Sequence, residues 1–377
     1  MKFLFFHLMP YLDANDSPTG WPAPNKQFNP GLGHELYDTY LKEIVLAEQC
    51  GFDYLAVNEH HMSPYSLMAN PNLIAGALSY RTQHAKLAVL GNLVPLLNPV
   101  RVAEEYAMLD VMSGGRLIAG LMRGIPHEYM AYNIPPDESW ERFKEACDLI
   151  VKCWTEPEPF AWEGKYYQYR AVSIWPRPMQ QPHPNILLSG GSIESAKYAA
   201  KKRAMIGIIR VKSIDDAKRN IQAYVDTARA EGWEPTPEHV LVGFHACIAE
   251  TDKKARELLE AGENYFYHVL SKAQHEAGQL ILQKSKYDNS RDSQPQTGRF
   301  NEAQAKAGEM SFDDRIRNHT LICGSPETVV EQIKFLRKEL GAGIFSLNFK
   351  IAKIPHEDVV KGLQLFQEKV LPHVRNL

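Results

Sequence analysis

Residues 34–61, HELYDTYLKEIVLAEQCGFDYLAVNEHH, contain the repeating unit from which the fold can be predicted. Apolar residues recur with the spacing of one helix face at Tyr37, Leu41, Ile44 and Val45. Gly51 follows, and glycine is common just beyond a helix end. Phe52 to Val57 is a short apolar run, which is typical of a buried strand. The stretch therefore predicts a helix from His34 to Cys50 that leads into a strand.

The same alternation of strand and helix recurs along most of the chain. Apolar runs that indicate strands lie near residues 2, 53, 87, 117, 185, 205, 241 and 344, with helical patterns between them. Strands that alternate with helices form a parallel sheet. Eight such strands fit a closed barrel better than an open doubly wound sheet. We therefore predict an α/β fold, a (β/α)8 TIM barrel with insertions, as a single domain over residues 1–377.

Three segments interrupt this alternation. Residues 160–175 are aromatic and alternate around Glu163-Gly164-Lys165, which predicts a β-hairpin insertion. Residues 278–312 are mostly polar, and the two alternatives for them are a disordered insertion and a mobile lid beside the last strand. The loop from Pro10 to Gly33 is longer than ordinary connections. Because loops after the strands build the active site of a barrel, we expect both long segments to cover it.

The composition argues against several classes of protein. The chain has 42 Lys and Arg against 45 Asp and Glu, so it lacks the positive excess typical of nucleic-acid binding. No apolar run approaches the ~18 residues of a membrane helix. The five cysteines are scattered without a CxxC pair, and the Rossmann, P-loop and zinc-protease motifs are absent. We expect a cytoplasmic enzyme with neither nucleic acid nor membrane as a partner.

Asn58-Glu59-His60-His61 follows the second predicted strand directly. The C-terminal ends of barrel strands are where barrels carry out chemistry, and imidazole can hold or transfer a proton near neutral pH. His60 is therefore a candidate catalytic residue. A structural histidine at a strand end and a zinc ligand are the alternatives, although no third ligand pattern is evident.

Two further sequence elements have features of an anion-binding site. Arg123 follows the fourth strand, and an arginine there can bind a phosphate with two parallel hydrogen bonds. Ser189-Gly-Gly-Ser-Ile-Glu-Ser195 joins the fifth strand to a helix, whose first N–H groups favour anions. An ion pair for Arg123 and a simple N-cap for Ser192 remain alternatives. Together the two elements predict one phosphate between the fourth and fifth strands.

These residues belong to longer stretches that resemble the bacterial luciferase-like, flavin-dependent monooxygenases. The resemblance covers nearly the whole chain and rests on the following segments in order: Ala47–Asp53 with Asn58–His61 ("ECGFD…EHH"), Asn98–Glu104 with Leu109–Arg116 ("HPVR…LD.MS.GR"), Cys323–Glu327 ("GTPE") and Leu365–Pro372 ("LF…V.P"). It implies an eight-stranded barrel that uses reduced FMN as a co-substrate. It also implies that O₂ is activated as a flavin C4a-(hydro)peroxide and that one oxygen atom enters an organic substrate.

The resemblance also implies roles for individual residues. His60 matches the active-site histidine of the family, Arg123, Ser192 and Ser195 match its phosphate ligands, and Gly191 beside them is expected near the cofactor. Leu90-Gly91-Asn92 matches the position of a non-prolyl cis peptide beside the flavin ring, and Gly91, which has no side chain, suits the close approach of that ring. Met122 and Gly191 replace a Cys and a Glu of luciferase, which does not favour light emission from an aldehyde.

The absence of a dinucleotide motif fits a two-component system, in which a separate NAD(P)H:flavin reductase supplies the reduced FMN. A homodimer built from helices of the first half, such as Asn72–Arg81, is expected from the family. A small apolar substrate is suggested by apolar residues near strand ends: Phe5, Phe6, Met9, Leu96, Leu97 and Met122. A deazaflavin-dependent oxidoreductase and a non-catalytic flavin-binding protein are the alternative functions.

Overall fold

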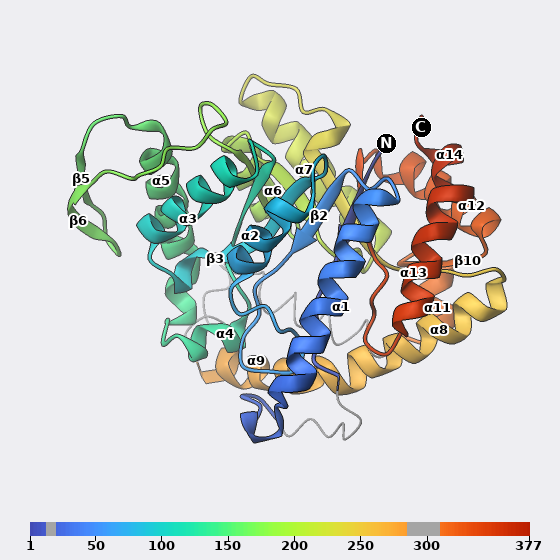
Figure 1. The fold of residues 1–377 in the computed structure, drawn as a ribbon. Coiled ribbons are helices and arrows are strands. Elements are labelled where there is room, and N and C mark those ends of the chain that lie inside the picture. Colours follow the sequence, from blue (N-terminus) through green and yellow to red (C-terminus); the bar gives the residue numbers. More distant parts are fainter. Residues whose placement is uncertain (13–19, 285–309) are drawn as a thin grey trace.

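The computed structural model describes residues 1–12, 20–284 and 310–377. Eight parallel strands form a closed barrel surrounded by helices (Figure 1). Their bounds are β1 Lys2–Phe6, β2 Tyr54–Val57, β3 Lys86–Leu93, β4 Leu117–Met122, β7 Asn185–Ser189, β8 Met205–Ile208, β9 Val240–Ile248 and β11 Ile344–Asn348. The sheet order is β9-β11-β1-β2-β3-β4-β7-β8, and pairing of β8 with β9 closes the ring. The predicted barrel is confirmed, with each strand where the sequence indicated it.

The helices follow the strands as the alternating pattern predicted. Their bounds are α1 Pro30–Gln49, α2 Pro71–Arg81, α3 Pro99–Met112, α4 Pro126–Ala131, α5 Ser139–Thr155, α6 Ile193–Lys201, α7 Ile214–Ala230, α8 Asp252–Tyr265, α9 Lys272–Lys284, α11 Phe312–Arg317, α12 Pro326–Leu340, α13 His356–Leu365 and α14 Leu371–Val374. Helix α1 begins before the predicted His34, because the Asn29 side chain accepts hydrogen bonds from Gly31 and Leu32 and Pro30 suits the first turn. No helix among the described residues has the length and apolarity to cross a membrane.

One strand was not predicted from the sequence. β10 (Leu321–Gly324) pairs with the second half of β9, beyond the end of β8. Its four residues are buried but too few to show a period, and the last two of them begin the Cys323–Glu327 segment. The strand extends the sheet beside the barrel without entering the closed ring.

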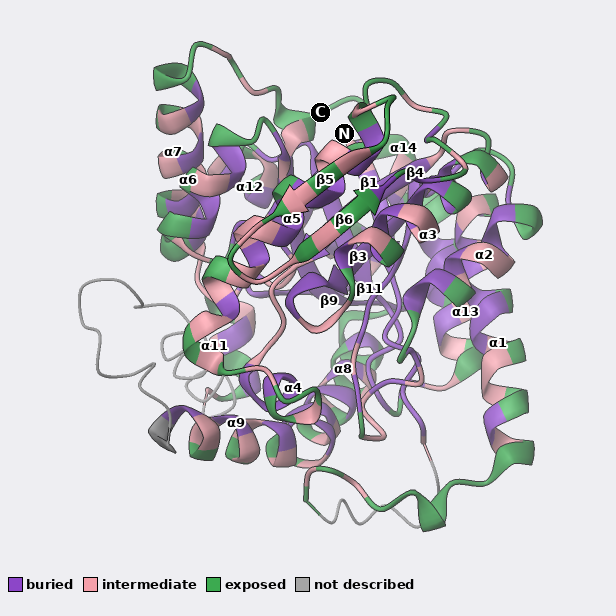
Figure 2. Ribbon diagram, turned by 90° about the vertical axis from the view of Figure 1, so that its left-hand side faces the viewer, coloured by how far each residue is buried: buried purple, intermediate pink, exposed green. Residues whose placement is uncertain are grey.

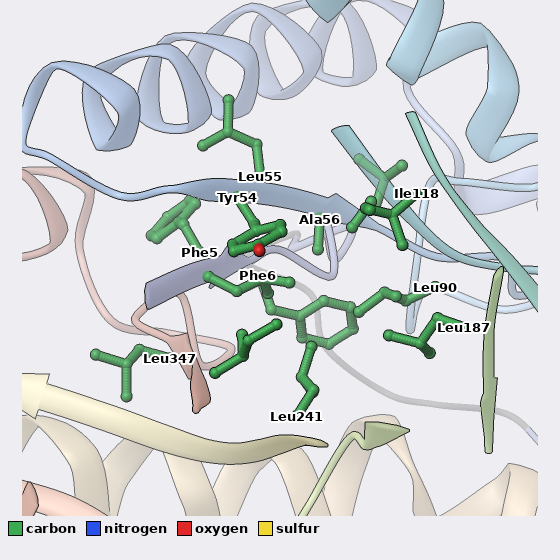
Figure 3. Close-up of a cluster of buried hydrophobic side chains, with 14 of the residues drawn as sticks. Phe5, Phe6, Tyr54, Leu55, Ala56, Leu90, Ile118, Leu187, Leu241 and Leu347 are labelled. Atoms are coloured by element: carbon green, nitrogen blue, oxygen red, sulfur yellow. The ribbon is translucent and has the colours of Figure 1, made fainter. Parts of the chain in front are cut away.

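The interior of the barrel is filled by apolar side chains rather than by a channel (Figure 3). Phe6, Tyr54, Leu90, Leu187 and Leu241 converge from five strands. Because side chains alternate along a strand, the neighbours of these residues face the surrounding helices instead. A packed interior places any ligand chemistry at the C-terminal end of the strands.

Two insertions lie outside the barrel ring. β5 (Phe160–Glu163) and β6 (Gln168–Val172) form an antiparallel hairpin, seen near α5 in Figure 2. Glu145 of α5 accepts hydrogen bonds from the Tyr166 and Tyr167 backbone and holds the hairpin tip. Of the segment with a mobile lid as one alternative, residues 278–284 are helical as the end of α9, and residues 285–309 lie outside the described residues.

Helices also lie across the C-terminal end of the barrel. Figure 1 shows α4, α8 and α9 below the strands, and α4 packs against α9. A π-helical turn, η5 (Phe266–Leu270), joins α8 to α9. The Gln274 side chain of α9 donates a hydrogen bond to Ser63 Oγ at 2.8 Å, which ties α9 to the loop after β2. The end of the barrel where chemistry is expected is therefore covered by protein.

Strands β3 and β4 approach so closely that two glycines are required. A Cβ atom at Gly91 would lie 2.3 Å from the Gly120 carbonyl oxygen, and one at Gly120 would lie 1.9 Å from the Val89 carbonyl oxygen. The pairing register shifts here, and the Leu90–Gly91 peptide is cis, as the resemblance implied. The sequence analysis assigned Gly91 to the approach of a flat ring, but the structure shows that packing against Gly120 already demands a glycine.

We predict that Gly120→Ala lowers the free energy of unfolding by ~1–3 kcal/mol, because the new methyl group meets backbone that cannot move aside. Gly76→Ala is the control, since its Cβ would lie 3.9 Å from the nearest side-chain atoms. Alanine in a helix is favoured over glycine by up to ~1 kcal/mol, so the control is expected to be as stable as the parent protein or more so. Urea unfolding measures both, and equal midpoints for the two variants would contradict the close contact.

Candidate functional site

The residues singled out from the sequence lie on neighbouring strands of the barrel. His60 follows β2, Gly91 and Asn92 lie in β3, Arg123 follows β4, and Ser192 follows β7. These four strands are consecutive in the sheet order. Their C-terminal ends therefore form one continuous side of the barrel end.

His60 is held by a buried carboxylate of α4. Its Nδ1 lies 2.8 Å from Glu128 Oε1, and the side chain of His60 is 18% exposed while that of Glu128 is 0%. Burial alone would raise the pKa of Glu128, but the hydrogen bond and charge of His60, together with His127 and the Ile125 N–H, lower it. An ionised carboxylate only accepts hydrogen bonds, so Nδ1 of His60 is the donor. Nε2 makes no hydrogen bond to the described residues and is left for a ligand.

His61 has a different environment from His60. Its Nε2 lies 2.8 Å from Glu59 Oε1, and its Nδ1 lies 3.1 Å from the Tyr132 hydroxyl. Glu59 also accepts a hydrogen bond from the Leu93 N–H at 3.0 Å, yet burial keeps the pKa of this carboxyl raised. Both ring nitrogens of His61 are thus engaged and the ring is buried. The two histidines bind separate carboxylates, and the described residues contain no group of three side chains placed to hold a metal.

The sequence analysis missed both Glu128 and its helix. α4 is six residues long, too short for an apolar period to be seen. Its start nevertheless carries a readable signal, Pro126 at the first helical position and Glu128 two residues later. The Glu128 side chain accepts a hydrogen bond from the Ile125 N–H, which satisfies the helix start.

Asn92 directs its side chain towards the first turn of α2. Its Nδ2 donates to Asn72 of α2 at 3.2 Å, and Asn72 in turn donates to Glu105 of α3 at 2.6 Å. Its backbone N–H donates to the Tyr106 hydroxyl. The Asn92 side chain therefore joins β3 to α2 and, through Asn72, to α3.

Arg123 and the second half of α6 contact the same aromatic residue, Trp140. The Arg123 guanidinium lies 5.6 Å from the centre of the Trp140 ring, and that ring contacts Tyr198 of α6 edge-on at 5.4 Å. At the start of α6, Ser192 Oγ accepts from the Ser195 N–H and lies 2.8 Å from Ser195 Oγ. Gly191 is exposed beside them. Ser192 is thus an N-cap, and the cap, the glycine and Arg123 have the composition of a phosphate site.

The apolar residues expected around a substrate divide between two environments. Phe6 lies in the barrel interior, whereas Phe5 faces outward and packs against Phe52 and Phe349 (Figure 3). Part of the apolar set is therefore core between barrel and helices. On the opposite side of the barrel end, Arg210 and His245 approach a buried Glu263, and none of the three was singled out from the sequence.

Comparisons with known proteins agree with this architecture. The family model described as luciferase-like monooxygenase matches residues 18–342. The FMNH₂-dependent dimethylsulfone monooxygenase of Pseudomonas putida is 24% identical to this chain in sequence. The match covers 90% of this chain and 88% of the length of that relative. A crystal structure of a monooxygenase from Streptomyces bottropensis superposes with a TM-score of 0.76 at 26% identity, covering 99% of both chains.

Another relative matches over a shorter stretch. The oxygenase component of the flavin-dependent trigonelline monooxygenase of Acinetobacter baylyi is 24% identical over 62% of this chain. The chain covers 65% of that relative's length and 57% of the length of a further relative from Sinorhizobium fredii. These relatives are thus matched over less than two thirds of their length.

His127, next to Glu128, is expected to make the protein sensitive to acid. Burial lowers the pKa of His127 from 6.5 to about 4, and its ring packs edge-on against Trp21. Between these two values the unfolded chain takes up a proton that the folded protein does not. Stability therefore falls as the pH drops from about 6.5 towards 4, by up to ~3 kcal/mol.

We predict that His127→Phe, which keeps a ring against Trp21 but cannot titrate, loses less stability between pH 7 and pH 4.5 than the parent protein. Urea unfolding at both pH values measures the loss. His84→Phe, at an exposed position, is the control and is expected to keep the acid sensitivity of the parent. Identical pH dependence in all three proteins would contradict the role of His127.

Proposed function

Because the chain belongs to the luciferase-like monooxygenase family, we propose that it oxygenates a small organic molecule using reduced FMN and O₂. We further propose that a separate NAD(P)H-dependent reductase supplies the reduced FMN. The names of two relatives support this reading, since one is FMNH₂-dependent and the other is the oxygenase component of a flavin-dependent system.

The observation that carries the proposal is the orientation of His60. Glu128 fixes Nδ1, so that Nε2 is the nitrogen available at the end of β2. A ring held in this way can keep a proton at Nε2 or accept one there, without losing its orientation. Such a group suits a reaction in which a proton must be held or transferred beside a bound cofactor.

The remaining residues would bind the cofactor and shield the site from water. Arg123 and the N-terminus of α6 would hold the FMN phosphate, because a guanidinium and the positive end of a helix dipole both favour anions. Reduced FMN, when bound, would supply the electrons that activate O₂, one atom of which enters the substrate while the other leaves as water. Helices α4, α8 and α9 lie over this end of the barrel and would limit the entry of water, which suits oxygen chemistry that water would divert.

A homodimer is part of the proposal, and exposed apolar side chains support it. Leu73 and Tyr80 of α2 are 73% and 77% exposed, and Met108 and Val111 of α3 are also exposed. α2 packs against α3, so these side chains belong to neighbouring helices of the first half. Apolar surface of this kind is typical of a protein interface.

We predict that Arg123→Ala weakens binding of reduced FMN by ~10–100-fold, because a charge-assisted hydrogen bond contributes ~1.5–3 kcal/mol. Anaerobic fluorescence titration measures the affinity. Arg219→Ala is the control, since Arg219 is exposed on α7 and pairs with Asp216. Unchanged affinity in Arg123→Ala would mean that the phosphate lies elsewhere. Tighter binding of a reduced deazaflavin than of FMN would favour the alternative hydride-transfer enzyme.

We predict that His60→Ala keeps FMN affinity but lowers substrate oxygenation by ~10²–10⁴-fold, the span expected for a lost proton-transfer group. Hydrogen peroxide release is expected to rise as oxygen is wasted. His61→Ala is the matched comparison, and we expect it to lower stability, because Glu59 and Tyr132 lose their shared partner.

Product and peroxide are measured together for both histidine variants. Normal coupling in His60→Ala with loss of coupling in a folded His61→Ala would reverse the assignment of the two histidines. Normal coupling in both variants would remove histidine from the mechanism. The absence of any oxygen uptake by the parent protein with reduced FMN would favour a non-catalytic flavin-binding protein.

A further inference from the structure

The half of the barrel end formed by β8, β9 and β11 carries buried polar residues that the proposed flavin site does not use. Arg210 follows β8, His245 lies in β9 and Asn348 ends β11. Asn348 and His245 are register partners on adjacent strands, so their side chains share one face of the sheet. That face is the barrel interior, because Leu241, four residues before His245, points inward (Figure 3).

This half of the barrel end carries an excess of buried positive charge. Glu263 of α8 is fully buried and pairs with Arg315 at 2.7 Å, with Arg210 at 3.3 Å and with His245. Burial would raise the pKa of Glu263, but these three neighbours lower it to about 2, so it is ionised. Burial and the nearby Arg210 lower the pKa of His245 to about 4, so this ring is neutral at pH 7. Two guanidinium groups therefore face one carboxylate.

Several polar atoms here lack a partner among the described residues. Arg210 Nη1 is buried without a hydrogen bond, although Nη2 contacts Glu263. Asn348 is 2% exposed, and neither its amide oxygen nor its amide nitrogen has a partner. Buried donors without acceptors are costly, so their persistence at the end of the barrel indicates a missing ligand.

Aromatic rings connect this region to the proposed catalytic histidine. The Arg210 guanidinium lies over the rings of Phe266 and Tyr267 at 5.0 and 4.8 Å. The Phe266 ring lies 5.6 Å from that of Tyr65, and Tyr65 lies 4.8 Å from the ring of His60. A small molecule held at Arg210 could therefore extend along an aromatic wall towards His60.

We propose that Arg210 and Asn348 anchor a carboxylate of the substrate, so that the substrate is an organic acid whose apolar body extends towards His60. This inference rests on the proposed oxygenase function. A guanidinium and an amide N–H offer donors that match the two oxygens of a carboxylate. The bound anion would also balance the second guanidinium charge. The apolar substrate expected from the sequence is thereby refined to an apolar body with one anionic group.

The test compares acids with amides of the same shape. Three pairs of compounds are titrated calorimetrically into the protein in excess FMN. The pairs are acetate with acetamide, benzoate with benzamide, and cyclohexanecarboxylate with cyclohexanecarboxamide. We expect at least one acid to bind 10-fold or more tightly than its amide. Arg210→Gln is expected to remove this preference and Asn348→Ala to reduce it, while Arg210→Lys, which keeps the charge, retains part of it. Arg256→Gln, on the exposed side of α8, is the control and keeps the full preference.

The outcomes separate this inference from the proposed function. The absence of an acid preference in all three pairs, or its survival in a folded Arg210→Gln, overturns the carboxylate anchor and leaves the flavin function intact. If Arg210→Gln weakens FMN binding as Arg123→Ala is expected to do, Arg210 belongs to the flavin site and the anchor is also overturned. If the parent protein prefers acids but binds no reduced FMN, the anchor stands and the oxygenase function fails.

Discussion

The burial of carboxylates at the C-terminal end of the barrel is the constraint on which the arrangement of the site depends. An ionised carboxylate removed from water must be supplied with hydrogen-bond donors. Glu43 receives them from His7 and His356, Glu59 from His61, Glu128 from His60, and Glu263 from His245 and Arg315. Each buried acid thus orients a histidine. Glu43, Glu128 and Glu263 also join a helix to the end of a strand, whereas Glu59 joins the loop after β2 to β3 through the Leu93 N–H. The rigidity of the site follows from this requirement.

Much of the fold could be predicted from the sequence, because buried parallel strands form short apolar runs that alternate with amphipathic helices. The same logic located His60 and Arg123, since residues directly after a barrel strand face the reactive end. It failed where structure depends on distant partners. Glu128 and Glu263 look like ordinary surface acids in the sequence, and only folding brings them to His60 and His245. The hydrogen bond from Asn92 to Asn72 of α2 was equally unpredictable, because it joins residues 20 positions apart in the sequence.

The end of the barrel divides into two halves with different chemistry. Strands β2, β3, β4 and β7 carry the histidine and the elements suited to a phosphate, while β8, β9 and β11 carry the guanidinium and amide groups proposed for the substrate. Tyr65 and Phe266 lie between the halves. A cofactor and a substrate that must react need such adjacent but separate anchors, because each can then be fixed without displacing the other.

The histidine pair shows how similar residues acquire different roles through burial. Glu59 and Glu128 are both buried, but the pKa of Glu59 is raised whereas that of Glu128 is lowered. Glu128 faces two histidines and the Ile125 N–H, and it is therefore the more stable anion. A stable anion fixes the Nδ1 proton of His60 and leaves Nε2 as the nitrogen that can contact a ligand. His61 binds Glu59 and Tyr132 through its two nitrogens, so neither nitrogen is left for a ligand. The carboxylate behind each ring thus decides which histidine can act on a ligand.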